Sequence, residues 1–139
     1  MGVILIVTAC SSRANLPVQE VTVFKGGSCG CCGVYSQYLG RQGLTVKNID
    51  MPDISVAKTQ FNIPSSMESC HTTQIGDYFV EGHIPTEAME KLMSEKPDIA
   101  GIAMPGMPSG SPGMPGAKQG PFVIYAIGKD GSISEFMRI

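Results

Sequence analysis

The sequence predicts an α/β fold in which short strands alternate with helices in the order βαβαββα. Three observations support this prediction. Short runs of β-branched and aromatic residues recur along the chain, apolar residues between them repeat at helical spacing, and Gly, Pro and Asp mark the intervening turns. Strands are therefore expected at residues 21–24, 45–49, 72–75 and 78–81, with helices on both faces of a small sheet.

The first helix is predicted directly after the first strand and its loop. Val34, Tyr35, Tyr38 and Leu39 recur at a spacing that forms one apolar stripe. Gly43 stands where the C-terminus of such a helix is usually capped. We therefore expect a helix that follows the cysteine-rich residues 29–32 and ends before this glycine.

Two further helices are predicted from their boundary residues. Asp53 can cap the second helix, because its carboxylate can accept hydrogen bonds from the free N–H groups of the first turn. Pro85 is suited to open the third helix and Pro97 to end it. Gly76 and Asp77 predict a tight turn between the third and fourth strands. The residues expected to face the core from the second and third helices are Ile54, Ala57, Phe61, Ala88, Met89, Leu92 and Met93.

The C-terminal third of the chain predicts a long loop followed by a β-hairpin. Residues 101–121 contain 11 Gly or Pro among 21 positions, which argues against any regular structure there. A loop of this length is usually functional or disordered, and we favour a function. Residues 122–127 and 132–137 read as the two strands of the closing hairpin.

Length and charge narrow the possible functions. With 139 residues the chain fits a single domain. The net charge is −2 and the 10 Lys and Arg residues form no run, which argues against nucleic-acid binding. The unusual feature of the composition is sulfur, because the chain contains 5 Cys and 9 Met.

The first residues resemble an export signal. Met1 begins an apolar run that ends at Ala9 and is too short to span a bilayer. Residues 7–10 resemble the lipobox of a bacterial lipoprotein, in which Cys10 would carry the lipid anchor, although no basic residue precedes the apolar run. We therefore predict a leader and tether over residues 1–20, a domain over 21–139, and a periplasmic or cell-envelope location. The alternative is an apolar N-terminus on a cytosolic protein.

The remaining cysteines indicate thiol chemistry. Cys29, Cys31 and Cys32 lie at the expected start of the first helix, where the helix dipole and free N–H groups favour thiolates. Cys29 and Cys32 have the spacing used by both redox dithiols and metal sites. A third thiol favours a metal, because three adjacent thiolates repel one another unless a cation or a disulfide neutralises them. A disulfide with spare thiols remains the alternative. Thiolates select Cu(I), Zn(II) or iron–sulfur clusters.

A second pair of candidate ligands precedes the third strand. In an α/β sheet of this topology, Cys70 and His71 would face the first strand–helix turn and so lie beside the other thiols. His71 could then serve as a ligand. His83 is expected instead to cap or pack at the entry of the third helix, with a ligand role as the alternative.

The methionines fall into two groups. Met104, Met107 and Met114 lie on the Gly/Pro-rich loop, where packing needs no methionine. Thioethers suit Cu(I) and bind zinc poorly, so these residues favour copper. The methionines expected to fill the core or act as spacers are Met51, Met67, Met89, Met93 and Met137.

Several segments in the same order resemble one family. They are residues 21–25, 29–33, 69–72, 81–85 and 106–114. The chain resembles the family of small exported bacterial metal-binding proteins that includes the copper resistance protein CopG. This resemblance implies a thioredoxin-like fold and Cu(I) held in a thiolate-bridged, multinuclear cluster.

Carried over by position, the implied ligands are Cys29, Cys31, Cys32 and Cys70, with Met107 and His71 as further candidates. Two departures accompany the resemblance. Tyr35 stands where the family often has Trp, and the Cys70–His71 pair occupies the stretch where thioredoxins have a cis-proline.

Three functional hypotheses follow. The first is a Cu(I)-binding envelope protein that sequesters copper or passes it to another envelope protein, in support of copper resistance. The second is a thiol–disulfide oxidoreductase in which Cys29 attacks and Cys32 resolves, or a protein whose thiols reduce Cu(II). The third is a structural zinc site, which leaves the methionines of the loop unexplained.

Overall fold

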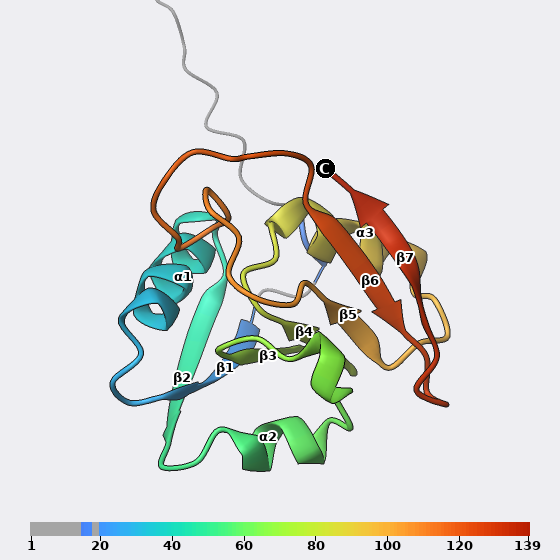
Figure 1. The fold of residues 1–139 in the computed structure, drawn as a ribbon, viewed down its shortest axis with the longest axis horizontal. Helices are drawn as coiled ribbons and strands as arrows, with labels where there is room; N and C mark the ends of the chain where they lie inside the picture. Colours follow the sequence, from blue (N-terminus) through green and yellow to red (C-terminus); the bar gives the residue numbers. More distant parts are fainter. Residues whose placement is uncertain (1–14, 18–19) are drawn as a thin grey trace, which may run out of the picture.

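The computed structural model describes residues 15–17 and 20–139 (Figure 1). The apolar run and Cys10 lie outside these residues. Leu16, predicted to belong to the tether, is only 8% exposed and packs into the main core. The N–H of Asn15 donates to the Oε1 atom of Glu90 at 2.8 Å. The segment around Leu16 therefore contacts the folded domain.

One mixed seven-stranded sheet forms the centre of the fold, in the order β2-β1-β3-β4-β5-β6-β7. β1 pairs in parallel with β2 and β4 with β5, and the other neighbours are antiparallel. The βαβαββα order is confirmed, as is the closing hairpin. The strands are β1 (Glu20–Gly26), β2 (Thr45–Met51), β3 (Thr72–Ile75), β4 (Tyr78–Glu81), β5 (Gly101–Ala103), β6 (Val123–Ile127) and β7 (Ile133–Arg138).

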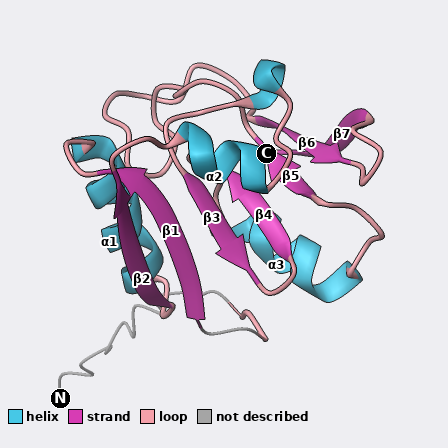
Figure 2. Ribbon diagram, turned by 90° about the horizontal axis from the view of Figure 1, so that it is seen from below, coloured by secondary structure: helices cyan, strands magenta, loops and turns pink. Residues whose placement is uncertain are grey.

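The three helices cover both faces of the sheet, as predicted. They are α1 (Gly30–Arg41), α2 (Ser55–Gln60) and α3 (Thr86–Glu95). Figure 2 shows α1 and α3 behind the sheet and α2 in front of it. The larger core lies under α1 and α3 and includes Leu39 and Leu92, and a smaller core around Phe79 lies on the side of α2. Gly43 follows α1 with φ at 96°, which confirms its predicted role at the end of that helix.

The Gly/Pro-rich segment is more ordered than its composition predicts. Its first residues form β5 between β4 and β6, so the expectation of no regular structure from residue 101 is wrong. Gly101 permits this pairing, because a Cβ atom there would lie 2.3 Å from the carbonyl oxygen of Phe79. Met104, predicted on an exposed loop, is only 2% exposed and belongs to the main core. Val34, predicted on the inner stripe of α1, is 45% exposed.

Among the described residues, no helix has both the length and the apolar character needed to cross a membrane.

The loop of residues 104–121, orange in Figure 1, leaves β5, arches over to α1 and returns to β6. This path places the loop beside α1 at Tyr35 and beside Ser69, which directly precedes Cys70.

Candidate metal centre

The first three thiols of the centre come from the start of α1. Cys29 is the N-cap residue of the helix, and Cys31 and Cys32 lie in its first turn. This arrangement confirms their predicted place at a helix N-terminus. A disulfide joins Cys29 to Cys32, whereas Cys31 is a free thiol with its Sγ atom 3.5 Å from that of Cys29.

Cys70 reaches the same point from the other side of the fold. It follows the 3₁₀ turn Ser65–Met67 and lies directly before His71 and β3. Its Sγ atom lies 4.0 Å from that of Cys31, and the four sulfur atoms lie within 4.8 Å of one another. The prediction that the sheet topology brings Cys70 beside the α1 cysteines is therefore confirmed.

Two imidazoles complete a second group of close donors around Cys70. The Nδ1 atom of His71 lies 3.2 Å from the Sγ atom of Cys70, and the Nε2 atom of His83 lies 3.0 Å from it. These three donor atoms also lie within 4.8 Å of one another. Cys70 therefore belongs to both the four-sulfur group and the Cys–His–His group.

His83 is a further candidate donor, for which the sequence favoured packing over ligation. It packs before α3 with no exposed surface, as expected, and its Nε2 atom also faces Cys70. The pairing of β3 with β4 places Thr72 opposite Glu81, so the residues just beyond these two strand ends meet. The predicted strands 72–75 and 78–81, joined by a tight turn at Gly76 and Asp77, already imply this register, so the signal that brings His83 to the cysteines was present in the sequence.

Burial keeps both imidazoles neutral, and a hydrogen bond also fixes the tautomer of His83. The Nδ1–H group of His83 donates to the carbonyl oxygen of Pro112 at 2.7 Å, which leaves the lone pair of Nε2 directed toward Cys70. Burial lowers the pKa of His83. Burial, the neighbouring His83 and the charge of Lys58 lower the pKa of His71 to about 3. Both rings are therefore neutral at neutral pH, which is the form that binds metals.

The free thiols have a different electrostatic setting. Burial and then the charge of Cys31 raise the pKa of the Cys70 thiol to about 12. Cys70 is therefore a protonated thiol at neutral pH when no metal is bound. Binding of a metal ion to this sulfur must release its proton.

Tyr35 supports the two imidazoles from the side of α1. Its side chain is fully buried, and its hydroxyl donates to the carbonyl oxygen of Ile84 at 2.8 Å. The centre of its ring lies 4.6 Å from that of His71 and 5.5 Å from that of His83. A residue of this kind fixes the orientation of ligand rings by packing rather than by ligation.

The Gly/Pro-rich loop contacts the residues around the centre at three points. One is the bond from His83 to Pro112, and a second is the hydroxyl of Ser69, which donates to the carbonyl oxygen of Gly106 at 2.6 Å. The third is Gly113, where φ is +84° and a Cβ atom would lie 2.9 Å from the backbone nitrogen of Tyr35. Met107 follows Gly106 and is 49% exposed, so its thioether lies at the surface of this loop.

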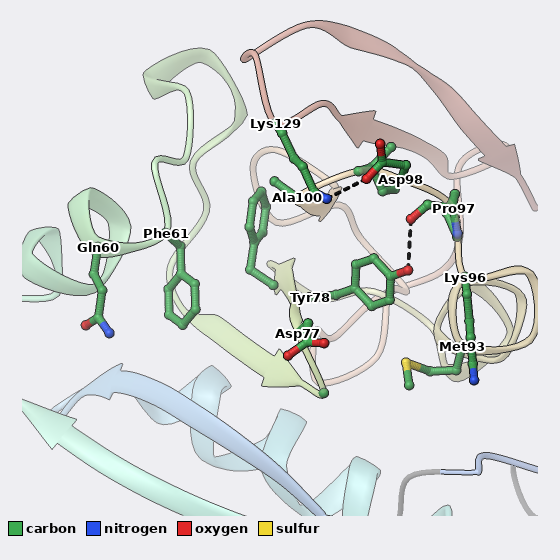
Figure 3. Close-up of a pocket in the computed structure, with 13 residues that line it drawn as sticks. Gln60, Phe61, Asp77, Tyr78, Met93, Lys96, Pro97, Asp98, Ala100 and Lys129 are labelled. Atoms are coloured by element: carbon green, nitrogen blue, oxygen red, sulfur yellow. Dashed lines mark hydrogen bonds and ion pairs between the residues drawn. The ribbon is translucent and has the colours of Figure 1, made fainter.

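A separate cavity of about 660 Å³ lies away from the cysteines, between the end of α2 and the turn that joins β6 to β7. Figure 3 shows Phe61 on one side of it and the ion pair between Lys129 and Asp98 on the other. Tyr78 donates to the carbonyl oxygen of Pro97 along its wall. None of the lining residues is a cysteine or histidine, so this cavity is separate from the donor groups around Cys70.

The donor set determines what the centre can do. Thiolates and neutral imidazoles are ligands for soft and borderline metal ions. Cys31 and Cys70 are free, whereas Cys29 and Cys32 become available as ligands only when their disulfide is reduced. Because Cys70 is shared, its thiolate can bridge two ions. The cysteine cluster is therefore able to bind metal.

Comparison with known proteins agrees with this geometry. A family model described as a protein of unknown function, DUF411, matches residues 67–114, which contain Cys70, both histidines and most of the loop. No curated protein sequence matches the chain. Two solved structures of the copper resistance protein CopG, Form 1 and Form 2, each superpose with a TM-score of 0.80 at 36% sequence identity.

These likenesses extend over nearly the whole of both proteins. The Form 1 match covers 88% of this chain and 98% of the CopG chain, and the Form 2 match covers 86% and 97%. The mixed α/β fold is therefore the fold of CopG. The chain belongs to the family of the copper resistance protein CopG.

Proposed function

We propose that this protein binds Cu(I) in the bacterial cell envelope and sequesters or transfers it in support of copper resistance. The observation that carries the proposal is the sharing of Cys70 between the four-sulfur group and the Cys–His–His group. Two adjacent donor groups with a common thiolate suit several Cu(I) ions better than one zinc ion, which needs only four ligands. The proposed ligands are Cys29, Cys31, Cys32, Cys70, His71 and His83, with Met107 as a further donor.

Two further proposals concern the class of the fold and the location of the protein. The order β2-β1-β3-β4, with β1 parallel to β2 and antiparallel to β3, supports a thioredoxin-like core for residues 21–139. The resemblance of residues 1–10 to a lipoprotein signal supports an envelope location with a lipid anchor at Cys10. The copper donor or acceptor would then be another envelope protein.

The first prediction concerns stoichiometry. Anaerobic titration of the reduced, tag-free protein with Cu(I) is expected to give more than one ion per chain, because thiolates can bridge. Cys31→Ser should bind fewer ions, since it removes the sulfur between Cys29 and Cys70. Met93→Leu, a core methionine of α3, serves as the control and should match the wild type. A single bound zinc that resists Cu(I) would contradict the proposal.

The Cys29–Cys32 disulfide favours a second candidate, thiol–disulfide exchange, because it joins the two cysteines of a C-x-x-C pair at a helix N-terminus. In that reaction a substrate disulfide accepts two electrons from the dithiol, and the Cys29–Cys32 disulfide forms. Rapid reduction of insulin disulfides by a protein that binds no Cu(I), with full activity in Cys31→Ser, would favour this candidate over copper binding.

The second prediction concerns pH. Because Cys70 has a pKa of about 12, its thiol is protonated throughout the physiological range and loses its proton on binding Cu(I). His71, with a pKa of about 3, is already neutral and releases none. The Cu(I) affinity is therefore expected to rise about tenfold per pH unit for this thiol between about pH 6 and about pH 8. Competition with a Cu(I) chelator at several pH values measures this slope, and a pH-independent affinity would contradict it.

A further inference from the structure

Glu81 is a buried carboxylate at the end of β4 that binds the segment carrying Cys70 and His71. Its side chain has no exposed surface. Its Oε1 atom accepts a hydrogen bond from the N–H of Ser69 at 2.7 Å, and its Oε2 atom accepts one from the hydroxyl of Thr72 at 2.5 Å. The ammonium group of Lys58, from α2, forms an ion pair with Oε1.

The two hydrogen bonds lie on either side of the metal-binding pair. Ser69 directly precedes Cys70, and Thr72 directly follows His71, so one carboxylate holds both ends of the four-residue segment. The N–H of Gly82 adds a bond at 3.1 Å to the carbonyl oxygen of His71. These contacts fix the backbone of Cys70 and His71 in the metal-free protein.

Stability alone is a poor explanation for this ion pair. Lys58 is nearly buried, with 6% of its side chain exposed, and Glu81 is completely buried. Removing two charges from water is costly, and buried pairs of this kind are often replaced by apolar residues without loss of stability. What an apolar pair could not provide is the two acceptors for Ser69 and Thr72.

We propose that Glu81, held by Lys58, is a positioning residue of the metal centre. It keeps Cys70 and His71 in the arrangement seen beside Cys31 and His83. It acts through the backbone of residues 69–72 and does not bind the metal itself. This inference rests on the proposed Cu(I)-binding function.

Two double variants separate positioning from folding. Lys58→Met/Glu81→Leu removes both charges and both acceptors. Lys58→Met/Glu81→Gln removes the same charges, but its side-chain amide can still bond to Ser69 and Thr72. The leucine variant is expected to lose about 10- to 100-fold in Cu(I) affinity, whereas the glutamine variant should restore affinity close to that of the wild type. Chelator competition measures the affinities, and urea unfolding shows whether the two variants are equally stable.

A second measurement is independent of metal. In the metal-free protein, the alkylation rate of Cys70 by iodoacetamide should rise in the leucine variant and stay near the wild-type rate in the glutamine variant. Equal Cu(I) affinities in both variants and the wild type would overturn the positioning role and leave the proposed function intact. A wild type that binds no Cu(I) would overturn the proposed function. The alkylation rates would then decide on the positioning role by themselves.

Discussion

Cys70→Ser is expected to weaken Cu(I) binding more than any other single cysteine substitution. Cys70 is the residue common to the four-sulfur group and the Cys–His–His group. Removing its sulfur therefore takes a ligand from every ion held at the junction of the two groups. We expect a loss larger than the about 10- to 100-fold that follows loss of a group that only supports a ligand.

Cys31→Ser is the matched control, because it makes the same chemical change within the four-sulfur group alone. It should leave the Cys70–His71–His83 group able to bind one ion. Anaerobic chelator competition gives the affinity of both variants, and the thiolate-to-copper absorption reports the number of sulfur ligands. Wild-type affinity and stoichiometry in Cys70→Ser would show that the shared thiolate is not a ligand.

Local patterns were sufficient to predict most of the fold. The stripe that includes Tyr35 and Leu39 predicted α1, and alternating short strands predicted the sheet, because hydrophobic periodicity is set by neighbours in the chain. β5 was missed for a physical reason. β5 is only the three residues Gly101–Ala103, too short to carry a strand signal, and it is a strand because it pairs with β4 and β6, which are remote in sequence.

The candidate site was also predicted only in part from the sequence. Cys29, Cys31 and Cys32 could be grouped from their spacing, and Cys70 from the topology that follows from the order of the elements. His83 was not grouped with them, although the predicted turn at Gly76 and Asp77 implies the hairpin register that places His83 beside Cys70. The ion pair between Lys58 and Glu81 was even harder to predict, because it joins α2 to β4 through a contact that no periodicity in the sequence indicates.

The structure also relates the two chemistries left open by the sequence. When the Cys29–Cys32 disulfide is formed, two of the four sulfur atoms cannot bind a metal as thiolates. The remaining donors are then Cys31 and the Cys70–His71–His83 group. The redox state of one pair of cysteines thus sets how many ligands the centre offers, so thiol redox chemistry and metal binding are linked at the same atoms.

The buried His71 is expected to make the metal-free protein sensitive to acid. Its ring has no exposed surface, and its Nε2 atom has no hydrogen-bond partner among the described residues. In the unfolded chain His71 takes up a proton near the ordinary pKa of 6.5, but in the folded protein only near 3. Between these values the unfolded state binds more protons, so the free energy of unfolding falls as the pH falls. Above 6.5 the ring is neutral in both states and has no such effect.

The size of this effect is large for one residue. Each pH unit in the window costs about 1.4 kcal/mol, so the full span from 6.5 to 3 amounts to about 5 kcal/mol, against about 5 to 15 kcal/mol for the whole stability of a typical domain. His71→Phe keeps a ring against Tyr35 but cannot titrate, so its unfolding free energy should fall less steeply with acid. Burial raises the pKa of Glu81, which acts in the opposite direction but is common to both proteins. Urea unfolding followed by circular dichroism across this pH range measures the difference, and parallel curves for the two proteins would refute it.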